Sequence, residues 1–304
     1  MGVWCCLFDT IGNGYFQLIV IVSTLIFTLT TIIKNKSKNQ RQNLQIKWNA
    51  QGKDVVILHM FPRARYCPNP SPYPLKLETF LRIHKIKYVT DFEEPMSDKD
   101  KSPWITINGE NIADSQIAMD YLTKKFNLDS NPGLGKEQLI ISRGLRFMIE
   151  QDLYWVMANN RWVVEKGQHV PTFFAPLFPK YLAFLEPFML QIIYSKMVAK
   201  QTYAQGIGRH TLQEQESMGL RDIQDLSDYL GDNTYLMGTT EPTEIDCVLF
   251  GFIVMFLYAA PKDNVYVQSI LKNHQNLVKF VDRMKEKYWP DWEDCCYKDP
   301  TPLA

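Results

Sequence analysis

Residues 103–115 read PWITINGENIADS, a stretch that contains two strand signals and a helix start. Trp, Thr and Asn alternate with two isoleucines over 104–108, as expected of a strand with one buried face. Asn108-Gly109 follows, and this pair favours a tight turn between antiparallel strands. Asp114-Ser115 then supplies side chains that accept bonds from free backbone N–H groups at a helix start. The stretch therefore predicts a β hairpin and a helix that runs to about Phe126.

The chain before this hairpin predicts two more strands and another helix. VVILHMF at 55–61 is a short apolar run rich in β-branched residues, which is typical of a fully buried strand. After a proline-rich loop, apolar residues recur at helical spacing over 72–83, and 88–92 predicts a second strand. The order β, α, β, β hairpin, α indicates a small α/β domain over residues 54–128.

The chain after the hairpin domain is helical by its apolar period. Asn131-Pro132-Gly133 interrupts the pattern, and a capping box at Thr243 and Asp246 starts a later helix. The segments with a helical period are 139–159, 178–199, 214–230, 243–258 and 265–287. These features predict an all-α domain over residues 129–304.

The N-terminal region predicts a membrane anchor. Residues 15–33 carry no charge and have about the length of a bilayer-spanning helix. Four basic residues follow within 34–41, whereas only Asp9 precedes the stretch, so the positive-inside rule places the body in the cytosol. We therefore expect a short segment 1–14, a single-pass anchor and a polar linker 34–53. The organelle is open, with lysosomal and other endomembranes among the options.

Two alternatives to this topology stay open. A cleaved signal peptide competes with the anchor, although it requires a basic start and a small-residue cleavage site that this sequence lacks. The opening MGVWCC also loosely matches an acylated cytosolic N-terminus, with Gly2 and the Cys5-Cys6 pair as the modified residues. Acylation would require the apolar stretch to loop through the membrane, or the body to be lumenal.

Charge and cysteine usage exclude some classes of function. The 33 basic and 33 acidic residues cancel, so no phosphate-neutralising surface for nucleic acid is indicated. The six cysteines form two adjacent pairs and two singles, which is neither a disulfide framework nor a zinc pattern. Cys295-Cys296, beside acidic residues, makes a poor preformed site for a soft metal. We predict reduced thiols and no metal centre.

Five segments after the linker carry a resemblance to a known family. They are SPYPLKLETFLR (71–82), PWITINGENIADS (103–115), GIGRHT (206–211), GTTEPTEIDCVLFG (238–251) and YWPDWEDC (288–295). Together they resemble the glutathione-transferase superfamily, and more closely its failed axon connections family, which is related to metaxins and to cadmium-responsive membrane proteins. The resemblance implies an α+β fold with a thioredoxin-like N-terminal domain and an all-α C-terminal domain. It also implies glutathione or another small-molecule ligand, and a homodimer or protein partner.

Ser71 is the candidate catalytic residue. Only the thiolate of glutathione attacks an electrophile, and a hydroxyl at a helix N-terminus stabilises a thiolate with help from the helix dipole. Ser71 and Pro74 stand where thioredoxin relatives carry two cysteines, which disfavours disulfide exchange. Ser71 as a simple N-cap is an equal alternative. Tyr66, Cys67 and Tyr73 are nearby candidates for the same role.

The resemblance also implies residues for the rest of glutathione. Ser102 and Pro103 would form a cis peptide whose backbone pairs with the cysteinyl unit, with Trp104 next to it. Asp114 and Ser115 would hold the γ-glutamyl carboxylate at the start of their helix, and capping that helix is compatible with this role.

The GIGRHT motif adds two further candidates. Its glycines permit unusual backbone conformations that could direct Arg209 and His210 toward the cleft between the domains, where Arg suits a carboxylate and His a proton transfer. A structural loop or a partner contact is the alternative.

Three functions fit these observations. The first is a membrane-anchored glutathione transferase for detoxification, with Ser71 polarising the thiol. The second is a non-catalytic interaction module of the metaxin type at a membrane. The third is a stress-response protein whose thiols bind cadmium.

Overall fold

The computed structural model describes residues 43–173 and 184–298. The chain divides into two compact units, residues 1–53 and 54–304. The described part of the first unit contains one helix, over residues 43–49. All elements below belong to the second unit.

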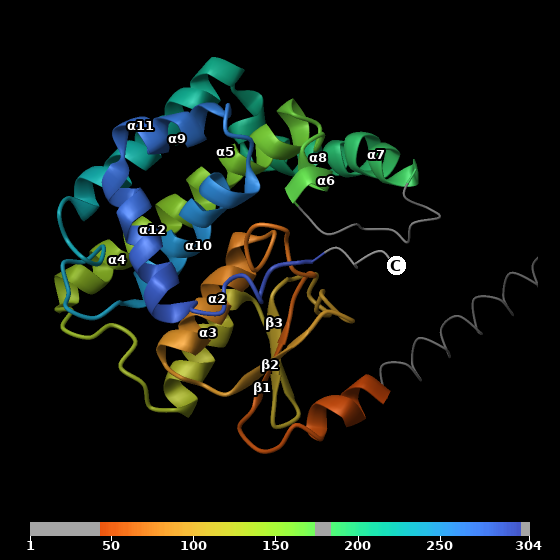
Figure 1. The fold of residues 1–304 in the computed structure, drawn as a ribbon, viewed down its shortest axis with the longest axis vertical. Helices are drawn as coiled ribbons and strands as arrows, with labels where there is room; N and C mark the ends of the chain where they lie inside the picture. The colour runs from red at the N-terminus through yellow and green to blue at the C-terminus, as the bar shows by residue number, and fades with distance from the viewer. Residues whose placement is uncertain (1–42, 174–183, 299–304) are drawn as a thin grey trace, which may run out of the picture. The chain divides into compact units, whose positions relative to one another are not determined.

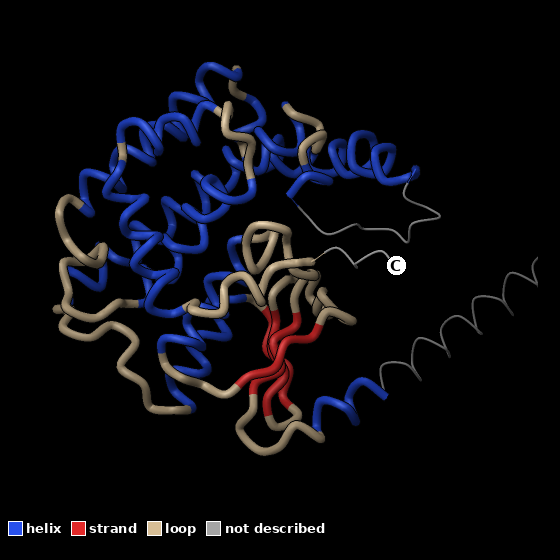
Figure 2. The backbone as a smooth tube through the Cα atoms, viewed as in Figure 1, coloured by secondary structure: helices blue, strands red, loops and turns tan. Residues whose placement is uncertain are grey.

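The second unit begins with a four-stranded sheet, whose strands are drawn in red in Figure 2. Its strands are β1 (Val56–His59), β2 (Tyr88–Asp91), β3 (Trp104–Ile107) and β4 (Glu110–Ala113), in the spatial order β2-β1-β3-β4. β1 is parallel to β2 and antiparallel to β3, and β3 pairs antiparallel with β4. The predicted hairpin is confirmed, because Asn108 and Gly109 form its turn with φ angles of 51° and 85°.

Two helices pack on one face of this sheet, α2 (Pro72–Ile83) and α3 (Ser115–Lys125). Figure 1 shows them together on one side of the strands. Their apolar side chains join those of the strands in one buried core, which includes Leu58, Phe80, Ile105, Met119 and Leu122. The thioredoxin-like part of the predicted fold is therefore confirmed.

Where the structure describes it, the rest of the second unit is mainly helical, also as predicted. Its elements are α4 (Lys136–Met148), η1 (Ile149–Leu153), α5 (Tyr154–Asn159), η2 (Asn160–Val164), α6 (Val170–Phe173), α7 (Glu186–Phe188), η4 (Met189–Tyr194), α8 (Ser195–Gln205), η5 (Ile207–Arg209), α9 (Leu212–Leu230), α10 (Glu244–Ala259), α11 (Val265–Asn273) and α12 (Gln275–Tyr288). The single helix predicted over 139–159 is instead α4, a wider π-helical turn and α5. Part of the helix predicted over 178–199 lies outside the described residues.

Helix α10 joins the helical part to the sheet domain. Its capping box is confirmed, since the Asp246 carboxylate accepts from the Thr243 N–H at 2.7 Å and from the Thr243 hydroxyl at 2.9 Å. Gly251 lies where α10 meets α2, and a Cβ there would approach the Pro72 carbonyl oxygen to 2.7 Å. Only glycine allows this close packing, which positions the first turn of α2.

The structure corrects the membrane part of the sequence predictions. In the two described ranges, no helix combines the length and the apolar composition needed to cross a bilayer. Helix α10, for example, is apolar but has 16 residues, and most of its side chains are buried in the protein core. The predicted fold class, which included a transmembrane helix, and the predicted single-pass localisation are wrong on this point. The predicted anchor itself, residues 15–33, lies outside the described residues.

Candidate functional site

Ser71 occupies the N-cap position of α2, with Pro72 as the first helical residue. Its backbone N–H donates to the Asn69 side-chain oxygen at 3.0 Å. Its hydroxyl caps no backbone group and has no hydrogen-bond partner among the described residues. The alternative role as a side-chain cap is thus not used, and the hydroxyl is free to donate at the positive end of a 12-residue helix.

Ser71 lines a cavity of about 440 Å³. One wall comes from the loops after β1 and β2, and the other from α5, η2 and η4 of the helical part. Most of the lining is apolar and includes Phe61, Phe92, Met157, Trp162 and Leu190. The Ser71 hydroxyl beside a largely apolar wall suits a polar reacting atom next to an apolar molecule.

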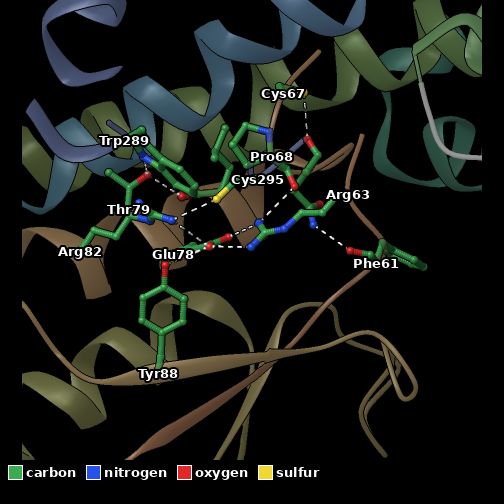
Figure 3. Close-up of polar contacts among 12 residues, drawn as sticks. Phe61, Arg63, Cys67, Pro68, Glu78, Thr79, Arg82, Tyr88, Trp289 and Cys295 are labelled. Carbon is green, nitrogen blue, oxygen red and sulfur yellow. Dashed lines mark hydrogen bonds and ion pairs between the residues drawn. The ribbon is translucent and has the colours of Figure 1, made fainter. Parts of the chain in front are cut away.

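Figure 3 shows how the loop before Ser71 is held. The Glu78 carboxylate of α2 is fully buried and accepts two bonds from the Arg63 guanidinium, at 2.6 and 2.9 Å. The Tyr88 hydroxyl donates to the same carboxylate at 3.0 Å, and Arg63 also donates to the Pro68 carbonyl at 3.2 Å. Buried bidentate pairs of this kind fix geometry, so the loop is anchored to the helix that Ser71 begins.

The segment after α12 packs against the same helix. Arg82 of α2 forms two bonds with Asp291, at 2.5 and 3.0 Å, and lies 3.8 Å above the Trp289 ring. The Trp289 indole N–H donates to the Thr79 hydroxyl at 3.1 Å, a contact drawn in Figure 3. The hydrogen bonds from Arg82 lower the pKa of Asp291 to about 2.

The same segment reaches the loop before Ser71 directly. The Trp292 indole N–H donates to the Tyr66 carbonyl at 3.2 Å, and the Tyr297 N–H donates to the Ala64 carbonyl at 2.7 Å. The segment after α12 therefore helps to hold the loop that leads to Ser71.

The nearby alternatives to Ser71 are placed differently. The Cys67 thiol is fully buried and donates to the Asn69 carbonyl at 3.2 Å, and burial raises its pKa to about 12. The Tyr73 hydroxyl donates to the Glu150 carbonyl at 3.3 Å. The cavity is not lined by Cys67, Tyr73 or Tyr66. Ser71 is the member of this group that faces it.

The predicted binding segment at 102–104 lies at the start of β3. The Ser102–Pro103 peptide is cis, as the resemblance implies. The Ser102 hydroxyl is buried without a hydrogen-bond partner among the described residues. The Trp104 ring is buried in the sheet, stacked 3.6 Å from the His59 ring, and its N–H donates to the Glu94 carbonyl at 2.9 Å. None of the three lines the cavity beside Ser71.

Asp114 and Ser115 lie at the start of α3, as predicted. Asp114 is the N-cap, with a φ of 82°, and its carboxylate accepts from the Gln116 N–H at 2.9 Å. Ser115 is the first helical residue and is buried. Their roles toward a γ-glutamyl group stay predictions.

The two GIGRHT candidates do not meet Ser71. The Arg209 Nε donates to the Tyr203 carbonyl at 3.0 Å, and the guanidinium lies 5.0 Å from the Tyr203 ring centre. His210 is 44% exposed, and its Nδ1 lies 3.7 Å from the Glu214 carboxylate. Neither residue lines the cavity, and their roles in substrate binding stay predictions.

Two buried polar clusters near the site are not foreseen from the sequence. The Lys76 ammonium, fully buried in α2, donates to Gln116 at 2.6 Å and to Glu150 at 2.8 Å, which links both domains. In the sheet, the His59 ring nitrogens lie 3.0 Å from Asp91 and 2.9 Å from Thr106. A lysine in an amphipathic helix and a histidine in an apolar strand carry no sequence signal for such partners.

The structure describes four of the six cysteines, namely Cys67, Cys247, Cys295 and Cys296. Over the ranges that the structure describes, no group of three or more His, Cys, Asp or Glu side chains is placed to hold a metal ion. Burial raises the pKa of Cys295 and of Cys296 to about 11.

Comparisons with known proteins agree with this fold. A family model described as the glutathione S-transferase N-terminal domain matches residues 72–167, and one for the C-terminal domain matches residues 219–284. The chain is also 32% identical to Failed axon connections of Drosophila melanogaster over 259 residues, which is 81% of this chain. The chain belongs to the failed axon connections family of the glutathione S-transferase superfamily. It spans 61% of the length of that fly relative.

Three other matching proteins have a lower sequence identity to the chain. The chain is 25% identical to the isoprene-epoxide–glutathione S-transferase of Rhodococcus sp. (strain AD45), over 77% of this chain and 99% of the relative. Glutathione transferase GSTFuA3 from Phanerochaete chrysosporium is similar in structure, with a TM-score of 0.53 at 14% identity over 82% of this chain and all of the other. A glutathione S-transferase from Methylobacterium radiotolerans, solved with glutathione sulfonate, has a TM-score of 0.51 at 14% identity over 82% of this chain and 99% of the other. The two solved structures support the fold alone. The protein is thus glutathione-transferase-like.

Proposed function

We propose that this protein is a glutathione-dependent transferase in which the Ser71 hydroxyl stabilises the glutathione thiolate and the adjacent cavity holds an apolar electrophile. The observation that carries the proposal is the free hydroxyl at the N-terminus of α2, on the wall of an apolar cavity of about 440 Å³. Glutathione, which is named for the Rhodococcus relative, supports this choice of thiol.

The reaction would proceed by nucleophilic transfer of sulfur. A free thiol has a pKa of about 8.5, so a donated hydrogen bond and the helix dipole are needed to favour the thiolate at neutral pH. The thiol proton leaves to solvent, the sulfur forms a bond to an electrophilic carbon, and that carbon releases its leaving group or opens its ring. In this proposal Asp114 and Ser115 hold the γ-glutamyl end at the start of α3, and the backbone at Ser102 holds the cysteinyl unit.

Replacing Ser71 with alanine tests the assignment. Because a hydrogen bond to a charged group contributes about 1.5–3 kcal/mol, we expect Ser71→Ala to lower kcat/KM by about 10- to 100-fold with chlorodinitrobenzene or an epoxide as electrophile. Ser217→Ala, at an exposed position of α9, is the matched control and should retain full activity. Activity of Ser71→Ala equal to that of the wild type would refute the role of Ser71.

A second candidate function is a non-catalytic interaction module, and the exposed face of α4 favours it. Leu139, Ile140, Ile141 and Phe147 are 41%, 72%, 43% and 43% exposed, which is a large apolar surface for one helix. This face would bind a second copy of the chain or a protein partner. Tight glutathione binding without turnover, together with a change from dimer to monomer in Ile140→Lys by sedimentation, would favour this function.

A further inference from the structure

The helix formed by α7, η4 and α8, which follow one another without a break, exposes a more apolar face than the one it buries. A surface helix normally has the opposite arrangement. The side chains that it buries include three polar ones among Glu186, Leu190, Ser195, Val198 and Thr202. Five large apolar side chains are instead between 43% and 73% exposed, namely Phe184, just before α7, Phe188, Ile192, Ile193 and Met197. An exposed apolar surface of this extent indicates a site of interaction.

These five apolar side chains form one stripe, which we call the outer stripe, on the side of the helix opposite its buried residues. Phe188 and Ile192 each lie two residues from the buried Leu190, and Met197 lies two residues after the buried Ser195. In a helix, a step of two residues rotates a side chain by about 200°. Figure 1 shows α7 and α8 at the edge of the helical part. The outer stripe therefore points away from the rest of the described helices.

The outer stripe is complementary to a second copy of itself. A two-fold axis between Ile192 and Ile193 would place two such helices antiparallel, with the same surface used by both copies. Phe188 and Met197 are equally far from that axis in the sequence, so each Phe188 would pack on the partner's Met197. Contacts between a thioether and an aromatic ring are favourable. The order of residues along the stripe thus fits a symmetric pair.

The charges near the outer stripe do not oppose this pairing. All five residues of the stripe are uncharged, and residues 187–213 contain no Asp or Glu. Lys196 and Lys200 are the exposed charges of the same helix. Across the proposed axis, the two Lys196 residues would lie about 10 Å apart along the helix direction alone, which exceeds the screening length of about 8 Å at physiological ionic strength. Like charges are therefore not brought together.

We propose that this protein self-associates through the outer stripe, with the helices of two copies antiparallel and Ile192 and Ile193 at the two-fold axis. The exposed parts of the five side chains amount to on the order of 500 Å² per copy, because an aromatic side chain alone can bury 150–250 Å². A pair would bury roughly 1,000 Å², which is at the lower limit for a specific interface. The association is therefore reversible, with a Kd in the micromolar range. It uses a helix other than α4 and requires no glutathione.

Sedimentation velocity of the full chain, at about 1 to 100 µM, tests this proposal by a charge swap. Phe188→Glu and Met197→Lys should each weaken self-association at least about tenfold, because the symmetric interface contains each change twice. The double variant should recover it, since the two new charges of opposite sign would face each other across the axis. Leu271→Glu replaces an apolar side chain of α11 that is 40% exposed, and as the matched control it should change nothing.

A crosslink at the axis gives an independent readout. Ile193→Cys should form a dimer with a short bismaleimide in excess of the wild type, and adding Phe188→Glu should remove the excess.

Several results would overturn the proposal. A monomeric wild type over the whole range, or self-association of Phe188→Glu equal to that of the wild type, would refute the role of the outer stripe. A double variant that stays as weak as the single ones would refute the antiparallel pairing. Loss of self-association in Ile140→Lys but not in Phe188→Glu would assign it to α4. Binding of a monomeric wild type to phosphatidylserine vesicles, lost in Phe188→Glu, would assign the stripe to a lipid surface instead of a second copy.

Discussion

Replacing Gly251 with alanine tests whether the close contact between α10 and α2 positions the site. A Cβ at this position would lie 2.7 Å from the Pro72 carbonyl oxygen and 3.2 Å from the Lys76 nitrogen. Carbon and oxygen atoms normally approach to about 3.3 Å, so the two helices must separate by about 0.6 Å. Both contacted atoms are backbone, and no side chain can rotate away to relieve the contact.

The expected magnitude follows from two opposing terms. Overpacking of a tight core costs about 1–3 kcal/mol, and the upper end applies where backbone is contacted. Alanine recovers about 1 kcal/mol through its higher helix propensity. We expect Gly251→Ala to lose about 2 kcal/mol of unfolding free energy in urea titrations followed by tryptophan fluorescence, and to lower kcat/KM because Pro72 adjoins Ser71.

Gly144→Ala is the matched control. Gly144 lies within α4, and a Cβ there would meet nothing within 4 Å. The same substitution should therefore gain about 1 kcal/mol from helix propensity alone. The two variants should differ by about 3 kcal/mol, and equal unfolding free energies would refute the reasoning about the contact of α10 with α2.

Two further predictions concern buried charges. Burial and the nearby Asp152 raise the pKa of Asp222 to about 7, so the folded protein holds a proton that the unfolded chain releases, and stability falls as pH rises toward 7. After allowance for screening by water, Asp222→Asn should thus stabilise the protein by about 1–2 kcal/mol at pH 8 and hardly at all at pH 4. Thermal unfolding at the two pH values measures this difference, and an equal effect at both would contradict the prediction. Lys76→Met should lower the unfolding free energy by about 3 kcal/mol, because it leaves the buried Glu150 with Arg146 as its one charged partner. The double variant Lys76→Met with Glu150→Met should recover most of this loss in urea titrations. A double variant no more stable than the single one would count against the buried pair.

Local signals predicted the elements that carry the site. The turn at Asn108-Gly109, the cap at Asp114 and the helix start at Ser71 each depend on a few adjacent residues, and the structure has them at those positions. The wider π-helical turn η1 has no such signal, so one long helix was expected in its place. The boundary between the domains at 128 and 129 stays a prediction.

Contacts between distant residues could not be predicted in the same way. Arg82 and Asp291 are 209 residues apart in sequence, and neither carries a mark of the other. Arg161 lies in a helical stretch whose period does not tell which side chains face a cavity. The membrane anchor was expected from hydropathy alone. The hydropathy of a segment is the same whether lipid or the rest of the protein surrounds it.

The ultraviolet thiolate band of bound glutathione tests the central claim most directly. Titrated against pH in complex with the wild type, the band should give an apparent thiol pKa at least about one unit below the ordinary value of about 8.5, because the Ser71 hydroxyl donates to the sulfur. In complex with Ser71→Ala the pKa should return toward that value. The same pKa in both complexes, or no thiolate at neutral pH with the wild type, would contradict the account.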